Sequence, residues 1–298
     1  MADPQLRYAP FTYDAWHNPD VLKLLSKIAG IDIIPQMDLE IGHINISVKN
    51  EQQAQAERAA VEVQQKAAED GNISGRPWED DKPVVGWHRD SYPFVCVLML
   101  SDCTNMIGGE TALKMENGEV MKVRGPGMVR PKSRASLDFL SSNLTQGCAV
   151  VMQGRYITHQ ALRALGAQER ITMVTSFRPK SPFVRDDTVL STVRGISDLS
   201  DLYFGFGEYR LEMLEARVTA QLKKLREDRQ AGKKTDTKAL KAFLAEQERF
   251  IQHTNREMVP EEEVVPGHQP EMHFENVELP PTPPNGEEES VAKRTRVA

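Results

Sequence analysis

Apolar residues follow several different patterns along this 298-residue chain, and each predicts an element. Between residues 41 and 48 they alternate with polar residues, which predicts a strand whose polar face carries His43, Asn45 and Ser47. Residues 92–100 instead form a continuous apolar run, and its short length and β-branched content favour a buried strand over a helix. Further strands are predicted after the turn at Gly108-Gly109, at 148–152 and at 169–177.

Helical patterns flank this strand-rich stretch. Asn18-Pro19-Asp20 predicts a helix start, with Asn as the cap and Pro at the first helical position. Residues 50–70 are rich in Gln, Ala and Glu, which predicts an exposed helix. Apolar residues then recur at helical spacing over 211–225 and again over 240–251, with a break at 231–234. This pattern predicts a helical hairpin, packed on the strand core or on a partner subunit.

These patterns divide the chain into four parts. Residues 1–83 hold N-terminal helices, one core strand and an exposed helical and loop segment. Residues 84–180 hold the strand core, and residues 181–260 a helical region. The acidic, Pro-rich residues 261–298 are predicted to be disordered. Within the core, residues 129–146 form an unusually long connection, and a true loop, a lineage insertion and a retained intron are all open interpretations.

Composition narrows the class of protein. The net charge of −6 argues mildly against general nucleic-acid binding, so no nucleic-acid partner is expected. Three cysteines do not suggest a disulfide framework. The chain shows neither a secretory leader nor an apolar run long enough to cross a membrane. We therefore expect a cytoplasmic protein that does not insert into membranes.

The candidate chemistry centres on His88-Arg89-Asp90 and on His159, about seventy residues later. In a strand, residues 88 and 90 point to the same side, so both can bind one ion while Arg89 points elsewhere. Two imidazoles and one carboxylate on one side of a metal leave its remaining positions open, which is the ligand set of non-haem iron oxygenases. His88, Asp90 and His159 are therefore the predicted metal ligands.

A second candidate group, Arg170 and Thr172, lies on one face of the predicted strand over 169–177. A guanidinium presents a planar fork that matches a carboxylate, and the hydroxyl two residues later can reach the same anion. Arg163 and Arg178 are rival candidates that fit the pattern less well.

The order His88-x-Asp90, Gly108-Gly109-Glu110-Thr111, His159 and Arg170-x-Thr172 resembles the Fe(II)/2-oxoglutarate-dependent dioxygenases. The resemblance covers roughly residues 84–180 and is nearest to fungal biosynthetic and uncharacterised members. It implies an α+β fold with a double-stranded β-helix core (jelly-roll, cupin-like), flanked by the N-terminal helices and the C-terminal helical hairpin. It assigns Fe(II) to the three metal ligands and 2-oxoglutarate to Arg170 and Thr172.

The resemblance also implies a reaction. Oxidative decarboxylation of 2-oxoglutarate to succinate and CO2 consumes O2, is supported by ascorbate, and is coupled to C–H oxidation of a small molecule. The expected outcome is hydroxylation, desaturation or ring formation on an amino acid or secondary-metabolite intermediate, with no catalytic group beyond the metal centre. His43, Asn45 and Thr111 are the candidate substrate contacts.

Two alternatives stay open: an oxygenase acting on a protein or nucleic acid, and a non-catalytic barrel that serves as an interaction module. Homodimerisation through the C-terminal helices is also expected.

Overall fold

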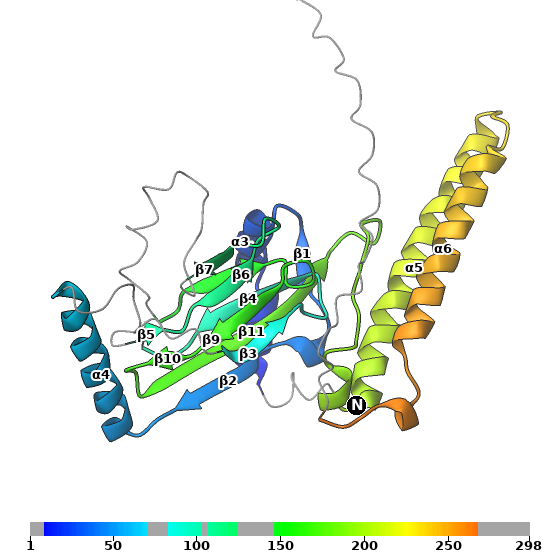
Figure 1. Cartoon of the computed structure of the whole chain (residues 1–298). Helices are drawn as coiled ribbons and strands as arrows, with labels where there is room; N and C mark the ends of the chain where they lie inside the picture. The colour runs from blue at the N-terminus through cyan, green and yellow to red at the C-terminus, as the bar shows by residue number, and fades with distance from the viewer. Residues whose placement is uncertain (1–8, 71–82, 103–105, 124–145, 268–298) are drawn as a thin grey trace, which may run out of the picture.

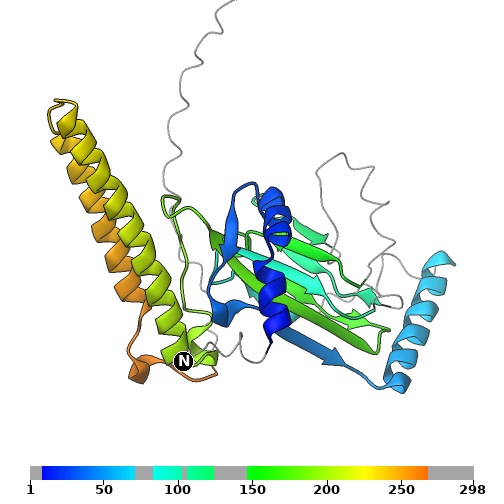
Figure 2. The same cartoon turned by 180° about the vertical axis from the view of Figure 1, so that it is seen from behind.

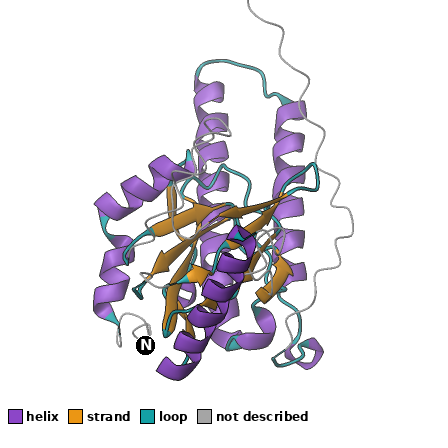
Figure 3. Cartoon of the chain, turned by 60° about the vertical axis from the view of Figure 1, so that its left-hand side comes forward, coloured by secondary structure: helices purple, strands orange, loops and turns teal. Residues whose placement is uncertain are grey.

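Two antiparallel sheets form the centre of the molecule, and helices lie around them (Figures 1 and 3). The structure is a computed structural model that describes residues 9–70, 83–102, 106–123 and 146–267. The predicted α+β class is confirmed as a mixture of helices and antiparallel sheets.

The strands divide between the two sheets and one short extra pair. The first sheet holds β1 (Ile33–Pro35), β11 (Glu169–Pro179), β4 (Phe94–Met99) and β8 (Ala149–Met152) in that order, with β2 (His43–Val48) also paired to β11. The second sheet has the order β3 (Pro83–His88), β9 (His159–Leu162), β6 (Thr111–Lys114) and β7 (Val120–Val123). The extra pair joins β5 (Ile107–Gly108) to β10 (Ala164–Leu165).

The strand pairing is nested. β2 pairs with β11, β3 with β9, β4 with β8, and β6 with β7. Within each half of this nest, successive strands lie alternately in the first and second sheets. The two halves are therefore the arms of one long antiparallel hairpin that winds back and forth between the sheets. This winding brings His88 at the end of β3 opposite His159 at the start of β9.

Two short helices, α2 (Pro10–His17) and α3 (Pro19–Ala29), cover the outer face of the first sheet (Figure 2). The predicted helix start is confirmed, because the Asn18 side chain accepts hydrogen bonds from the backbone N–H groups of Asp20 and Val21 at 2.9 and 3.4 Å. Trp16 and Leu25 of these helices pack with Phe177 of β11 in one apolar core. The odd-numbered residues of β11 therefore face outward to the helices, and the even-numbered residues face the second sheet.

The predicted exposed helix forms as α4 (Glu51–Glu69). It begins with a capping box between Asn50 and Gln53. Its first half is tied to the turn after β10, because Glu57 accepts from Lys49 Nζ at 2.8 Å and from the Gly166 backbone N–H at 2.9 Å. α4 thus lies at the β10 end of the sheets, where it contacts that strand.

The predicted helical hairpin is α5 (Leu199–Gln230) and α6 (Thr237–Glu257), which run side by side and extend away from the sheets (Figures 1 and 2). Three short 3-10 turns complete the described structure: η1 (Asp38–Glu40), η4 (Arg194–Ile196) and η5 (Glu261–Glu263). None of the described helices is long and apolar enough to cross a membrane.

Two predictions differ from the structure in detail. The alternating strand forms as β2, but its apolar face is not buried: Ile46 and Val48 are 66% and 67% exposed, because β2 lies at the sheet edge, beyond the core under α2 and α3. The tail predicted to be disordered from Glu261 instead starts with η5. Tyr203 donates to the Val259 carbonyl, which fixes the chain just before this turn. Most of the 129–146 segment and the tail from residue 268 lie outside the described residues.

Candidate metal centre

Two adjacent strands place the two imidazoles side by side. His88 ends β3 and His159 begins β9, and the two residues are direct partners in the antiparallel pair. Their rings lie with centroids 4.2 Å apart. Asp90 follows two residues after His88, beyond the last residue of β3. The structure therefore brings together the three residues that the sequence pattern selected as metal ligands.

The ligand atoms of these three side chains converge on one point. Asp90 Oδ1 lies 3.5 Å from His88 Nε2 and 3.6 Å from His159 Nε2. One ligand atom from each of the three residues lies within 4.8 Å of the others. Two atoms that bind one transition-metal ion at about 2.1 Å are roughly 3–4 Å apart. The two distances from Asp90 lie in this range, so the three ligand atoms are close to the spacing expected around a single ion.

Both imidazoles present the same nitrogen to this point. His88 Nδ1 lies 2.7 Å from the Gly86 carbonyl oxygen, and His159 Nδ1 lies 2.9 Å from the Ile157 carbonyl oxygen. A carbonyl can only accept, so each Nδ1 carries the proton and donates it. The Nε2 lone pair of each ring is then available for a metal, the usual arrangement for metal-binding histidines.

Gly154 packs directly against the Asp90 side chain. The Asp90 backbone N–H donates to the Gly154 carbonyl at 2.9 Å. A Cβ on residue 154 would lie 1.9 Å from Asp90 Oδ2, so only glycine leaves room for this carboxylate. Among the described residues, no hydrogen-bond donor reaches the buried Oδ2 atom. A buried carboxylate oxygen without a donor is costly, and a bound cation would compensate for that cost.

The two histidines differ in their affinity for protons. Burial lowers the pKa of His88, but the Asp90 carboxylate and the Gly86 carbonyl outweigh it, and the net shift is upward. Burial lowers the pKa of His159 more than the Asp90 carboxylate raises it. Of the two rings, His88 therefore holds an additional proton more readily than His159 does.

Sequence reasoning missed two positioning residues at this site. Gly154 is one of them, since its role depends on a packing contact with a residue 64 positions earlier. The other is Thr158, whose hydroxyl accepts a hydrogen bond from Arg89 Nε at 3.2 Å. This bond joins the segment that carries His88 and Asp90 to the residue before His159. Nothing in a single sequence marks either contact.

Arg170 and Thr172 lie on the even-numbered face of β11, which faces the second sheet. Their cross-strand partners on β2 are Ser47 and Asn45. Thr172 is only 2% exposed, and Met99 of β4 flanks it on the other side. The polar face of β2 therefore continues the face that carries the two predicted 2-oxoglutarate contacts.

The other candidates on this face have different surroundings. His43 is the cross-strand partner of Val174, and its Nε2 lies 3.3 Å from Glu40 Oε2. The rival Arg178 has a structural role, because its Nε donates to the Gln36 carbonyl at 3.1 Å and its guanidinium lies 4.6 Å from the centre of the Tyr209 ring.

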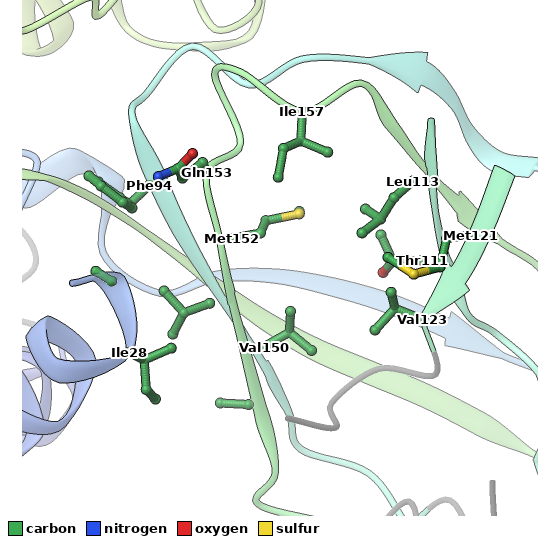
Figure 4. A pocket seen from close by; sticks show the side chains of 13 residues that line it. Ile28, Phe94, Thr111, Leu113, Met121, Val123, Val150, Met152, Gln153 and Ile157 are labelled. Carbon is green, nitrogen blue, oxygen red and sulfur yellow. The ribbon is translucent and has the colours of Figure 1, made fainter. Parts of the chain in front are cut away.

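An apolar cavity of about 320 Å³ is lined by residues of both sheets and by Ile28 and Ala29 at the end of α3, but by none of the three converging residues (Figure 4). Its lining includes Thr111, one of the candidate substrate contacts, but neither His43 nor Asn45. Leu113 on the same wall is the direct cross-strand partner of His159. Most of the remaining lining is aliphatic or thioether, from both sheets: Met121, Val123, Val150, Met152 and Ile157.

No protein-family model and no curated protein sequence matches this chain. Solved structures that are similar include an oxidoreductase of the 2OG-Fe(II) oxygenase family from Burkholderia pseudomallei, at 13% identity over 56% of each chain with a TM-score of 0.33. The match thus spans little more than half of that protein.

Two further similar structures are a prolyl-4-hydroxylase from Pseudomonas putida and IDO from Bacillus thuringiensis. The hydroxylase is 15% identical over 54% of this chain and 85% of its own, with a TM-score of 0.21. IDO is 12% identical over 57% of this chain and 91% of its own, with a TM-score of 0.23. Likenesses this distant carry no functional argument, so function is inferred from the residues themselves.

Proposed function

We propose that this chain is a non-haem Fe(II) oxygenase that couples decarboxylation of 2-oxoglutarate to C–H oxidation of a small molecule. One observation carries the proposal. His88, Asp90 and His159 converge with both Nε2 atoms available, while Asp90 Oδ2 has no donor among the described residues. Two imidazoles and one carboxylate are the protein ligands of this enzyme class, and they leave positions open for other ligands.

The strand order supports a double-stranded β-helix for the core. In such a fold, a long antiparallel hairpin winds between two sheets. The first strand therefore pairs with the last strand, and the second strand with the second-last. The pairs β2–β11, β3–β9, β4–β8 and β6–β7 follow this scheme. The metal ligands then lie at the end of the second strand, just beyond it, and at the start of the seventh.

The chain's own residues divide the work of the reaction. His88, Asp90 and His159 would hold Fe(II), which supplies the redox chemistry with O2 when bound. Arg170 and Thr172 would bind the distal carboxylate of 2-oxoglutarate by charge-assisted hydrogen bonds. The amide of Asn45, beside Thr172, can donate to the same carboxylate.

The cavity supports the proposal of a small-molecule substrate. Its walls beside His159 are aliphatic, with Thr111 contributing a hydroxyl. Such a wall excludes water and favours an aliphatic portion of the substrate next to the metal, with Thr111 orienting one polar group. A volume of about 320 Å³ suits a small molecule, which favours an amino acid or biosynthetic intermediate of the cytoplasm over a macromolecule.

Succinate formation tests the proposal. The protein is purified anaerobically and supplied with Fe(II), ascorbate, O2, 2-oxoglutarate and a panel of amino acids and metabolites. We expect succinate from the native chain and none above background from His159→Ala, because two ligands do not retain iron in the required geometry. Succinate production that is unchanged in His159→Ala would overturn the assigned ligand set.

A matched pair of arginine variants tests the 2-oxoglutarate contact. Arg170→Ala should raise the concentration of 2-oxoglutarate needed for half-maximal rate at least about tenfold, since a charge-assisted pair is worth about 1.5–3 kcal/mol. The requirement for Fe(II) should change little. Arg163→Ala serves as the control and should leave both requirements near the native values. An equal effect of Arg170→Ala on both requirements would contradict its role.

A further inference from the structure

In the part of the chain that the structure describes, the helical hairpin is fixed to the rest of the molecule through the first part of α5, up to Arg217, and the end of α6. Arg210 of α5 pairs with Asp186 at 3.2 Å, and Glu257 of α6 accepts from Arg194 at 3.1 Å. All buried side chains of α5 lie between Leu202 and Arg217. The remaining segment, 218–230, is about 20 Å long at about 1.5 Å per residue. It extends beyond the sheets with α6 beside it (Figures 1 and 2).

Exposed apolar side chains form a stripe along α5. Phe204 and Leu211 are 69% and 67% exposed, and Val218 and Leu222 are also exposed. Their spacings of seven, seven and four residues place all four within about 40° of one another, at about 100° per residue. Single exposed apolar residues are common, but several aligned along one side of a helix are a candidate interaction surface.

α6 carries a matching row, and it lies on the same side of the hairpin. Leu244 and Ile251 are exposed and seven residues apart. Arg210 and Arg217 of α5 lie against Phe250 of α6, which identifies the sides of the two helices that face each other.

From these facing sides, the exposed rows are rotated by about 115° on α5 and about 110° on α6, in the same sense along each chain. Because the helices are antiparallel, both rotations lead to one side of the pair. We name this side the hairpin face; it comprises Phe204, Leu211, Val218, Leu222, Leu244 and Ile251.

The hairpin face points away from the core. The α5 residues that pack into the core, such as Phe206 and Met213, lie about 140–160° around the helix from the stripe. A partner could therefore cover the hairpin face without contacting the sheets.

Charges along the hairpin indicate what covers this face. On its outer edge the base of α5 carries exposed Glu208 and Glu215, whereas the tip carries exposed Arg226 on this edge and exposed Arg229 in line with the apolar stripe. α6 repeats the pattern, with exposed Glu248 toward the base and exposed Lys241 toward the tip. An acidic base and a basic tip are complementary when two copies lie antiparallel, and they repel when two copies lie parallel.

We propose that the hairpin face binds the same face of a second copy of this chain, with the two hairpins antiparallel. The two-fold axis would pass between Val218 and Leu222 and near Leu244. This arrangement places the Glu208–Glu215 edge of one α5 opposite the tip of the other, which carries Arg226 and Arg229. The four helices then form an antiparallel bundle whose core consists of the two apolar rows from each copy.

The oligomeric state of the full chain tests this proposal. Sedimentation velocity at micromolar concentration should give twice the 33.5 kDa monomer mass. Val218→Glu/Leu222→Glu should raise the dimer dissociation constant at least about 100-fold, because both changes lie at the centre of the interface. The control Ala242→Glu/Arg249→Gln changes the charge equally at exposed positions on the opposite side of α6 and should remain dimeric. Far-UV circular dichroism confirms that each variant is folded.

Charge reversal tests the antiparallel arrangement. Arg226→Glu/Arg229→Glu should dissociate the dimer at low salt, and so should Glu208→Lys/Glu215→Lys. An equimolar mixture of these two variants should restore the dimer mass, since each then meets the opposite charge. A native chain that is monomeric, or a dimer that survives Val218→Glu/Leu222→Glu, would overturn the proposal. A dimer that survives Arg226→Glu/Arg229→Glu would overturn the antiparallel arrangement.

Discussion

Two aspartates show how differently this chain uses a carboxylate. Asp186, between the sheets and the hairpin, is almost fully buried and uses both of its oxygens. Its Oδ1 accepts from the backbone N–H and the hydroxyl of Thr188, and its Oδ2 from Tyr209 Oη and Arg210 Nη1. At Asp90, Oδ1 lies beside two imidazoles at distances too long for good hydrogen bonds, and no described donor reaches Oδ2.

The difference separates a structural carboxylate, Asp186, from a candidate metal ligand, Asp90. At Asp186 every lone-pair direction points to a donor of this chain, so a cation would have to displace an existing bond. At Asp90 the polar groups converge without satisfying one another, so an ion would supply the missing interaction. The candidate metal centre is therefore identified by polar side chains that converge without hydrogen-bonding one another, and not by burial or negative charge alone.

The largest expected effect comes from exchanging each aspartate for asparagine. Asp186→Asn leaves the Arg210 charge buried beside a neutral amide, so the free energy of unfolding should fall by about 3–5 kcal/mol. Asp90→Asn should change the metal-free free energy of unfolding by less than about 1 kcal/mol. Urea denaturation of both variants with chelator present measures these changes.

Metal titration of the same two variants completes the comparison. Asp90→Asn should lose Fe(II) binding, measured anaerobically by calorimetry, since a neutral amide is a poor ligand for this ion. Asp186→Asn should bind Fe(II) as the native chain does at temperatures where it is folded. Equal destabilisation by both substitutions would remove the distinction drawn between the two carboxylates.

A smaller effect is expected at the glycine behind Asp90. The Cβ of Gly154→Ala would collide with Asp90 Oδ2 and turn the carboxylate away from the two imidazoles. Fe(II) affinity should fall by about 10–100-fold, which is typical when a ligand loses its orientation. Gly86→Ala is a matched control, because a Cβ there would meet nothing within 4 Å although the residue lies two positions from His88. Similar losses in both variants would show that packing at Gly154 is not the cause.

Sequence patterns predicted the elements whose signals are local. The apolar run over 92–100 forms β4, the Asn18 cap starts α3, and the break at 231–234 separates α5 from α6. The His-x-Asp pattern also pointed to the candidate metal centre, but not for the reason given by strand alternation, because β3 ends at His88 and Asp90 lies beyond it.

The missed features depend on contacts between distant residues. The fit of Asp90 against Gly154 and the pairing of Asp186 with Arg210 arise only after the strands and the hairpin have packed. The alternation over 41–48 predicted a strand correctly, but burial of its apolar face depends on how far α2 and α3 reach along the sheet. How far the two helices reach is set by tertiary packing, and the alternating sequence pattern over 41–48 contains no information about it.

Glu40 carries a third carboxylate, and its pairing with a cation is intermediate between those of Asp186 and Asp90. It is buried, one of its oxygens lies 3.3 Å from His43 Nε2, and together with burial it raises the pKa of the Tyr92 hydroxyl. Among the described residues, the cationic partner of Glu40 is His43, whose imidazole is charged only below its pKa. The strength of this interaction should therefore depend on pH, unlike the Arg210 pair at Asp186.

The smallest expected effect follows from that dependence. The hydrogen bond to Glu40 raises the pKa of His43 above the ordinary histidine value of 6.5, although burial opposes the shift. A raised folded-state pKa means that the stabilisation is fully present below the unfolded-state value near 6.5 and is lost as pH rises through the folded-state value. Glu40→Gln should lower the pKa of His43, followed by NMR of the imidazole ring, and should flatten this part of the stability profile. His43→Asn should flatten the profile equally, because either change removes the same titrating pair; a profile that stays steep in His43→Asn would assign the pH dependence to another group.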